Sequence, residues 1–256
     1  MPGIAALPAG LDVGAVFSQA VATLRSKPLF FVFTGLMIGA FSLLGANLPV
    51  YLLGLLTGVA ALDILGYPHF FALRILETLV AAAMLQVLAV RATEGPAGGD
   101  ARTEFGPAVW AALPKLLPAL ATSLMAQVVV GLGLLLLVFP MVFFAVVFSL
   151  STVACILEDR SPLAALKRSR ELTWGNRWRV LGLLVILALV ALGVILLVEI
   201  SSAISDRYFG PGGLAARFLR GTAYALLSVF QAIVLTHAFL DLRRLRDELA
   251  NPVVPS

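Results

Sequence analysis

The stretch Glu158–Arg179, with the sequence EDRSPLAALKRSRELTWGNRWR, decides the fold of this chain. It is short and strongly basic, and it lies between two long apolar runs. Ser161 is a suitable N-cap residue, Pro162 suits the first helical turn, and Gly175 lies just beyond the far end of the helix. The pattern predicts a helix that lies on a membrane surface.

The two faces of this predicted helix differ in chemistry. The less charged face carries Pro162, Ala165, Leu166, Ser169, Leu172 and Thr173, and the opposite face carries Lys167, Arg168, Arg170 and Glu171. With two cations farther along, the basic cluster consists of Lys167, Arg168, Arg170, Arg177 and Arg179. Such a cluster anchors the topology of a membrane protein. It is also a candidate contact for a partner protein or for anionic lipid headgroups, where each cation contributes about 1 kcal/mol.

The composition identifies lipid as the solvent of most of this chain. Of 256 residues, 61% are hydrophobic and 12% are charged, and the mean hydropathy is +1.02. A soluble domain is about half apolar and a quarter charged. Six apolar runs are close to the length of about 20 residues that a membrane helix needs: Leu29–Leu48, Ala72–Val90, Leu116–Phe139, Met141–Leu157, Val180–Val198 and Gly221–Leu240. The sequence predicts an all-α integral membrane protein with six transmembrane helices.

The distribution of positive charge predicts the orientation of these helices. With six spans and both termini in the cytoplasm, all but four of the Lys and Arg residues lie on the cytoplasmic side. A further apolar segment, Val50–Leu65, contains Asp63. If it also spanned, the basic cluster would be on the opposite side from Arg25 and Lys27. We therefore expect it to be a short re-entrant or outer-leaflet helix in the first external connection of a multi-pass protein of the bacterial inner membrane.

An amphipathic stretch precedes each odd-numbered span and suggests a threefold repeat. The first runs from Val13 to Leu24, with Asp12 as N-cap and Pro28 as a stop; the second is Phe105–Leu116; the third begins at Ser161. The predicted architecture is three hairpins, each preceded by an amphipathic interfacial helix. All of them belong to one transmembrane domain, residues 1–256, with pseudo-repeats at roughly 12–92, 105–158 and 161–246.

The decisive stretch resembles a bacterial membrane-protein superfamily. It includes YciC-like uncharacterised proteins and the membrane domain of some glycerophosphoryl diester phosphodiesterases. The matching residues are Glu158, Ser161-Pro162, Ala165-Leu166-Lys167-Arg168-Ser169, Glu171-Leu172-Thr173, Gly175, Trp178-Arg179 and, after the last span, Asp241-Leu242-Arg243. The resemblance implies about six helices and no established activity. The chain lacks a soluble phosphodiesterase domain, and Phe239-Leu240 stands where relatives often have Tyr-Tyr.

Charged residues near the ends of the spans suggest ion pairs. Glu158, Asp241 and Arg243 are candidates for structural pairs, in which Glu158 or Asp241 meets Arg168, Arg170 or Arg243. Glu199 is a candidate to meet Arg217 or Arg220 across the last external loop. Asp63, His69, Arg74 and Glu77 gather near one end of the second span, but their spacing matches no metal motif, so no metal site is predicted.

The predicted spans contain few groups for chemistry. Their polar residues are Gln86, Gln127, Gln231, Thr236 and His237, which we expect to form hydrogen bonds between helices. No sequence motif of a hydrolase, metalloenzyme or nucleotide-binding protein is present, so we expect neither an enzyme nor a cofactor. We expect no nucleic acid as a ligand, because headgroups would occupy the basic cluster.

The leading hypothesis is a non-catalytic organiser of membrane lipid or partner proteins. The alternative is a transporter of lipid or small apolar solutes. A cavity lined by Gln127, Gln231 and His237 would favour it. Close or mobile helix packing would be permitted at Gly131, Gly133, Gly182 and Gly193.

Overall fold

The computed structural model describes residues 10–42, 84, 86–88, 90, 93, 101–136, 138–209 and 214–250. Every regular element in these ranges is a helix. In chain order they are α1 (Val13–Ser26), α2 (Pro28–Ser42), α6 (Ala101–Leu136), α7 (Val138–Phe148), α8 (Ser151–Leu157), α9 (Pro162–Thr173), α10 (Arg177–Phe209) and α11 (Leu214–Ala250). The predicted all-α class is confirmed for the part of the chain that is described.

Four segments of these helices are long and apolar enough to cross a membrane: Leu113–Gly133, Pro140–Leu157, Arg177–Ile204 and Leu219–Leu249. They correspond to the third to sixth predicted spans. The first predicted span is described only as far as Ser42, and most of the second, together with Val50–Leu65, lies outside the described residues.

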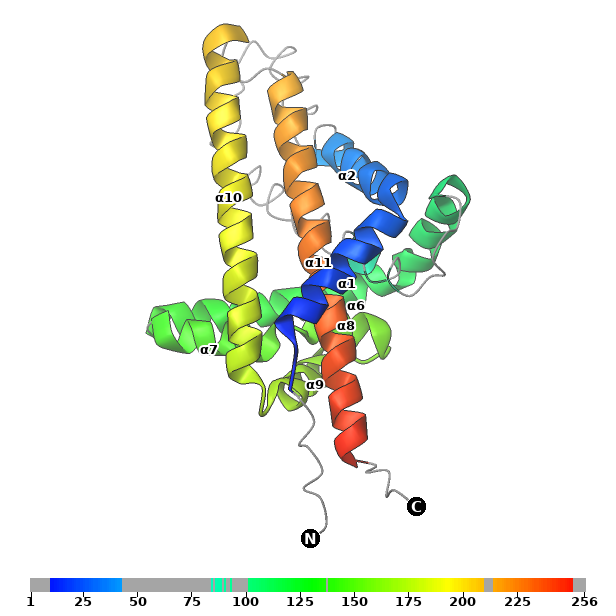
Figure 1. Cartoon of the computed structure of the whole chain (residues 1–256), viewed down its shortest axis with the longest axis vertical. Coiled ribbons are helices and arrows are strands. Elements are labelled where there is room, and N and C mark those ends of the chain that lie inside the picture. Colours follow the sequence, from blue (N-terminus) through cyan, green and yellow to red (C-terminus); the bar gives the residue numbers. More distant parts are fainter. Residues whose placement is uncertain are drawn as a thin grey trace.

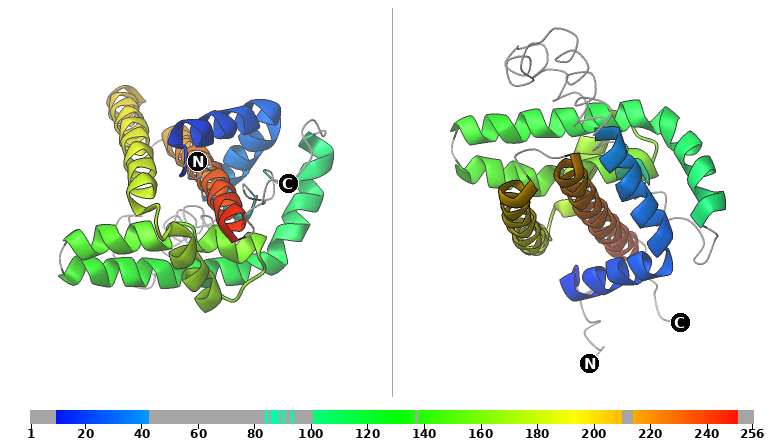
Figure 2. Two further views of the ribbon diagram at one scale, coloured as in Figure 1. Left: turned by 60° about the horizontal axis from the view of Figure 1, so that its bottom comes forward. Right: turned by 90° about the horizontal axis from the view of Figure 1, so that it is seen from above.

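Two groups of helices lie on different sides of α11. The helices α6 and α7 form one group, and α1 and α2 form the other. Figure 1 shows α10 and α11 side by side and antiparallel along the longest axis, with the α6–α7 hairpin lying across their lower half. Both views of Figure 2 show α6 and α7 next to each other, and α1 and α2 on another side of α11. The side chains of Val229, Ile233 and Phe239 place α11 at the centre of the core. The described residues contain four candidate spans, and the α6–α7 hairpin crosses the α10–α11 pair (Figure 1), so six spans in three hairpins remain a prediction.

Helix α1 begins and ends where the sequence predicts. The Asp12 carboxylate accepts hydrogen bonds from the backbone N–H of Gly14 (2.9 Å) and Ala15 (3.2 Å), and α2 begins at Pro28. Its apolar face packs on α11, where the Phe17 ring lies 6.2 Å from that of Phe230. Protein covers part of this face, since Val16 and Ala20 are buried while Val21 is exposed, and an interfacial position of α1 stays a prediction.

The second predicted interfacial helix is not a separate element. Phe105–Leu116 and the following span form the single helix α6, which contains Pro107, Pro114 and Pro118. Figure 2 shows that α6 bends along its length. Each proline removes a backbone donor and bends a helix without necessarily ending it. The predicted boundary is therefore replaced by a bend.

The fourth predicted span, Met141–Leu157, is interrupted. Helix α7 ends at Phe148 and α8 begins at Ser151, with a turn at Ser149 and Leu150. The turn contains neither glycine nor proline, which is why the sequence gives no local signal for it.

Gly133 allows the close approach of α6 and α7. A Cβ atom on Gly133 would lie 2.9 Å from the backbone Cα and N of Met141, whereas a Cβ on Gly131 meets nothing within 4 Å. Gly182 and Gly193 also face open space. Of the four glycines proposed for helix packing, only Gly133 is at a close contact.

We expect Gly133→Ala to lower the free energy of unfolding by about 1–3 kcal/mol, because the clash is with backbone that cannot rotate away. Gly131→Ala is the matched control in the same helix, and it is expected to be neutral or slightly stabilising. Thermal unfolding of the purified variants in detergent measures both. Equal losses in the two variants would contradict the close contact.

Candidate functional site

The candidate site is the end of the molecule where α9 connects to α10. Gly175 adopts a φ of 90°, a left-handed conformation that favours glycine, and this turn leads from α9 into α10. The buried residues of α9 are Ala165, Leu166, Ser169, Leu172 and Thr173. They are on the face that the sequence assigned as the less charged one. This face packs on α8, α6 and α7, so the basic face points outward.

Ser169 fixes α9 to the break between α7 and α8. Its hydroxyl donates to the Val147 carbonyl at 2.7 Å and accepts from the Leu150 N–H at 3.3 Å, and Ser169 is fully buried. A buried backbone group left without a partner is costly. Ser169 therefore supplies hydrogen bonds at the place where the α7 ladder stops.

Ser169→Ala is expected to cost about 1–3 kcal/mol of unfolding free energy, because it leaves a buried carbonyl and N–H unpaired. Ser161→Ala is the control at the start of the same helix, since the Ser161 side chain makes no capping hydrogen bond. Chemical unfolding followed by tryptophan fluorescence tests the pair. A loss in Ser161→Ala as large as that in Ser169→Ala would count against this role.

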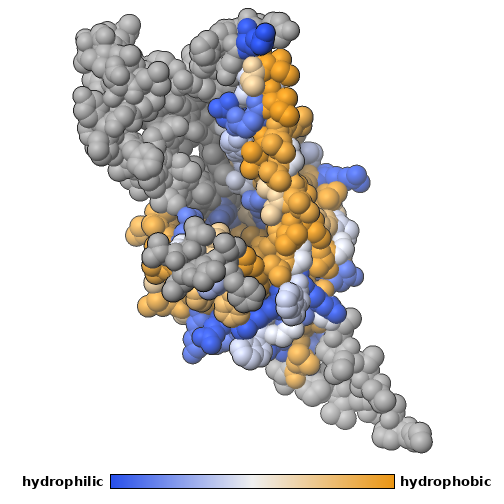
Figure 3. All heavy atoms as spheres, turned by 90° about the vertical axis from the view of Figure 1, so that its left-hand side faces the viewer, coloured by the Kyte–Doolittle hydropathy of each residue, from blue (hydrophilic) through white to orange (hydrophobic). Residues whose placement is uncertain are grey.

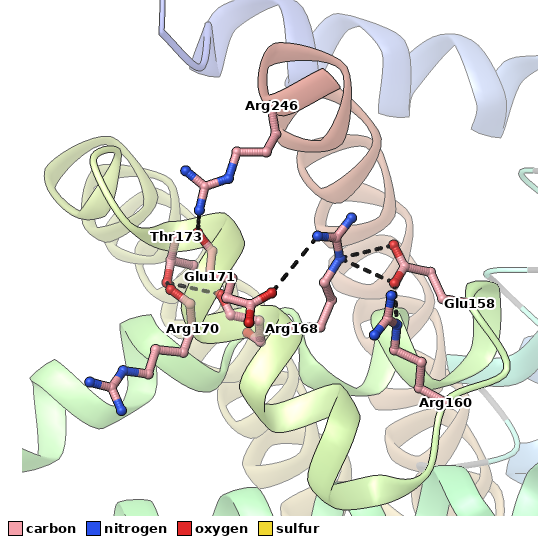
Figure 4. A network of polar contacts seen from close by, with 8 residues as sticks. Glu158, Arg160, Arg168, Arg170, Glu171, Thr173 and Arg246 are labelled. Carbon is pink, nitrogen blue, oxygen red and sulfur yellow. Dashed lines mark hydrogen bonds and ion pairs between the residues drawn. The ribbon is translucent and has the colours of Figure 1, made fainter. Parts of the chain in front are cut away.

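Glu158 is the acidic centre of the site (Figure 4). Arg168 Nε lies 3.2 Å from Glu158 Oε1 and 3.1 Å from Oε2, and Arg160 Nε donates to Oε2 at 2.6 Å. The Glu158 side chain is only 9% exposed. The carboxylate thus joins the end of α8 to α9. Next to it, Lys115 of α6 forms an ion pair with Asp159 and donates to the Ile156 carbonyl.

Both ends of the described chain join this site. Arg179 Nη1 donates to the Leu11 carbonyl at 3.2 Å, just before α1. Arg246 Nη2, near the end of α11, donates to the Glu171 carbonyl at 2.9 Å (Figure 4). The start of α1 and the end of α11 therefore lie on the same side of the molecule as α9.

The five residues of the predicted basic cluster have different environments. Lys167 and Arg170 are exposed and form no ion pair with any other described residue. Figure 4 shows Arg170 pointing away from the polar network. Arg168 is held by Glu158, and Arg179 by Leu11. Two cations are thus free for a ligand, while two contribute to packing.

The fifth cation, Arg177, is held between aromatic rings. Its guanidinium carbon lies 4.9 Å from the centre of the Phe143 ring and 4.5 Å from that of Trp174. Both distances are within the range of cation–π attraction. Arg177 therefore links the first turn of α10 to α7.

The other predicted ion pairs are formed only in part. Asp241 makes no ion pair with a described residue; it lies on α11 between His237 and Arg244 and interacts electrostatically with both and with Asp12. Arg243 is exposed. At the opposite end of α10, Glu199 Oε2 lies 3.3 Å from Arg220 Nη2, and Tyr224 donates to Glu199 Oε1 at 2.6 Å.

Two of the predicted polar residues within the spans join helices. His237 Nε2 lies 2.9 Å from the Thr23 hydroxyl of α1, and Gln86 accepts from Ser123 at 3.4 Å. Thr236 bonds within its own helix. Asp63, His69, Arg74 and Glu77 lie outside the described residues.

Sequence reasoning missed Ser169 and Lys115 as organisers of the site. A serine on the less charged face of a basic helix was the available signal for Ser169, since a buried hydroxyl needs partners. Lys115 follows a proline-rich stretch of α6, and nothing local pairs it with Asp159, 44 positions later.

Comparisons with known proteins support a membrane family without an assigned activity. The family model described as "Domain of unknown function (DUF7847)" matches residues 71–242. A UPF0259 membrane protein of Pectobacterium carotovorum is 33% identical over 98 residues, which are 38% of this chain and 39% of that protein. The match thus spans well under half the length of the relative. No solved structure matches the chain significantly.

These findings confirm the resemblance to an uncharacterised bacterial membrane family. They do not show the relation to the glycerophosphoryl diester phosphodiesterase membrane domain.

Proposed function

The chain belongs to DUF7847, a family of unknown function, and we propose that it is a non-catalytic organiser of anionic lipid at the cytoplasmic face of the bacterial inner membrane. The single observation that carries this proposal is the basic face of α9. Lys167 and Arg170 are exposed on it without an ion-pair partner among the described residues. The buried face, meanwhile, is fixed by Ser169.

A rigid helix favours binding at a charged surface. The buried face fixes the backbone of α9 before any ligand arrives, so the helix itself loses little conformational entropy when a headgroup binds. Cations near an anionic leaflet attract it with about 1 kcal/mol each. The positive-inside rule places such a face in the cytoplasm together with the start of α1 and the end of α11.

In this proposal the full layout has six spans with both termini in the cytoplasm. The α6–α7 hairpin crosses the α10–α11 pair (Figure 1), and four segments of these helices and of α8 are long and apolar enough to span. Helices of this apolarity satisfy their backbone hydrogen bonds internally, and this allows them to span.

Lipid counting in nanodiscs tests the proposal. The full-length protein in discs of phosphatidylglycerol and phosphatidylcholine is expected to retain phosphatidylglycerol above its share, as counted by native mass spectrometry. Arg170→Gln should lower that enrichment by about fivefold or less, which corresponds to one cation.

Arg207→Gln is the control, because Arg207 is exposed at the opposite end of α10. It should leave the lipids of the cytoplasmic side unchanged. Enrichment that is absent in the wild type, or equal in all variants, would contradict the proposal. A stoichiometric protein that co-purifies and is lost in Arg170→Gln would identify a protein partner as the ligand.

A further inference from the structure

A pocket of about 290 Å³ lies between α7 and α10, apart from the exposed face of α9. It is lined by Val142, Phe143, Val146, Arg177, Trp178 and Leu181. Five of these side chains are hydrophobic or aromatic, and one is a cation. The volume is just below the range of about 300–1,000 Å³ for small-molecule sites. It suits one segment of a hydrocarbon chain.

One donor of the cation in this pocket lacks a polar partner. Arg177 Nε is buried with no hydrogen-bond partner, and no described residue forms an ion pair with Arg177. The aromatic rings of Phe143 and Trp174 hold the guanidinium in place. They attract its charge but offer no hydrogen-bond acceptor. A buried guanidinium donor without an acceptor is costly, and a phosphate oxygen would satisfy it.

The surroundings of Arg177 also favour an anion. Arg177 is the first residue of α10, a 33-residue helix, so the positive end of the helix dipole lies at the same place. Trp178, at the edge of the pocket, is 84% exposed, and Trp174 is 60% exposed. Exposed tryptophans are typical of the headgroup level of a membrane.

An apolar stripe continues from the pocket along α10. Beyond Leu181, the exposed residues at spacings of three or four are Val185, Leu189, Leu192, Leu196 and Ile200. Figure 3 shows this side of α10 as an almost continuous apolar band above a more polar end. A hydrocarbon chain that enters the pocket can therefore continue along α10 without meeting a charge.

We infer that the pocket between α7 and α10 binds a single phospholipid with an anionic headgroup. Its phosphate accepts hydrogen bonds from Arg177, and one acyl chain lies against Phe143, Val146 and Leu181. This site is distinct from the α9 face, where headgroups bind by charge alone. Both sites bind anionic lipid, as in the proposed function, but they use different residues.

Photocrosslinking in nanodiscs tests the site. The probes are phosphatidylglycerol and phosphatidylcholine, each with a photoreactive diazirine on one acyl chain. In the full-length wild type, the phosphatidylglycerol probe should label peptides from residues 138–148 and 177–185 more strongly than the phosphatidylcholine probe. Arg177→Gln should reduce labelling by the phosphatidylglycerol probe about fivefold, the factor expected for one cation. It should reduce labelling by the phosphatidylcholine probe less, because the choline ammonium already neutralises the phosphate of that lipid.

A second variant keeps the charge and fills the pocket. Leu181→Phe should reduce labelling of residues 138–148 by both probes. Because Arg177 is intact in this variant, its result does not depend on whether Arg177→Gln folds correctly. Equal labelling by the two wild-type probes, or phosphatidylglycerol labelling unchanged in Arg177→Gln, would overturn the site.

The α9 variants separate this test from that of the proposed function. Lys167→Gln/Arg170→Gln should leave labelling of the pocket peptides unchanged, while lowering the overall phosphatidylglycerol enrichment. Labelling of these peptides that falls equally in Lys167→Gln/Arg170→Gln and in Arg177→Gln would overturn a separate site.

Discussion

Leu183→Ala is expected to lower the free energy of unfolding by about 3 kcal/mol, because it removes a fully buried side chain from the contact of α10 with the rest of the core. The vacated space is enclosed by protein, so neither water nor lipid fills it. Reversible unfolding in mixed micelles, with sodium dodecyl sulfate as denaturant, measures the loss.

Leu189→Ala provides a control on the same helix with the same change in volume. Leu189 is 62% exposed, and lipid or detergent chains can fill the space that its side chain leaves. We expect a loss of well under 1 kcal/mol, as for other surface substitutions. Equal losses of unfolding free energy in Leu183→Ala and Leu189→Ala would contradict the burial of Leu183 in the protein core.

Glu158→Gln is expected to cost about 3 kcal/mol, because it removes the nearer and more buried carboxylate paired with Arg168 and leaves only Glu171, at 3.9 Å. Arg168 is 19% exposed and Arg160 is 43% exposed, so solvent compensates mainly for the loss at Arg160. Glu248→Gln, at the exposed end of α11, removes a negative charge without removing an ion pair and should be close to neutral.

A double-mutant cycle separates the pair from its surroundings. Glu158→Gln/Arg168→Gln should cost less than the sum of the two single changes, by about 1 kcal/mol or more. Unfolding in the same mixed micelles gives all three values. Strict additivity would mean that the contact between Glu158 and Arg168 does not stabilise the protein.

Local signals made the helix boundaries at this end of the molecule predictable. Asp12 caps α1, Pro28 begins α2, and Gly175 makes the turn after α9. Each acts within a few residues, Asp12 through its side-chain carboxylate and Pro28 and Gly175 through their backbone preferences. The less charged face of α9 was predictable for a similar reason, because helical periodicity alone places its residues together.

Contacts between distant residues were not predictable in the same way. The break in the fourth predicted span is supported by Ser169, which comes about 20 residues later in the chain. The packing of α1 on α11 joins Thr23 to His237. An apolar helix face fits lipid and protein equally well on composition, so the sequence could not decide which of them covers it.

The candidate site was predicted as one basic cluster, but the cations differ in role. Charge and spacing identify Lys167, Arg168 and Arg170 as neighbours on a helix. The sequence offered Arg168, Arg170 and Arg243 as partners of Glu158, and the fold shows that Glu158 pairs with Arg168 and that aromatic rings hold Arg177. These partners lie on different helices, and their approach depends on tertiary packing.

The orientation of α10 across the membrane is the most direct test of the whole account. In a Cys155→Ala background, Lys167→Cys and Arg207→Cys are each labelled with a membrane-impermeant maleimide, in intact spheroplasts and in inside-out vesicles. We predict that Lys167→Cys reacts only in inside-out vesicles and Arg207→Cys only in spheroplasts. Labelling of Lys167→Cys in spheroplasts, or of both positions from the same side, would contradict a basic cytoplasmic end and a membrane-spanning α10.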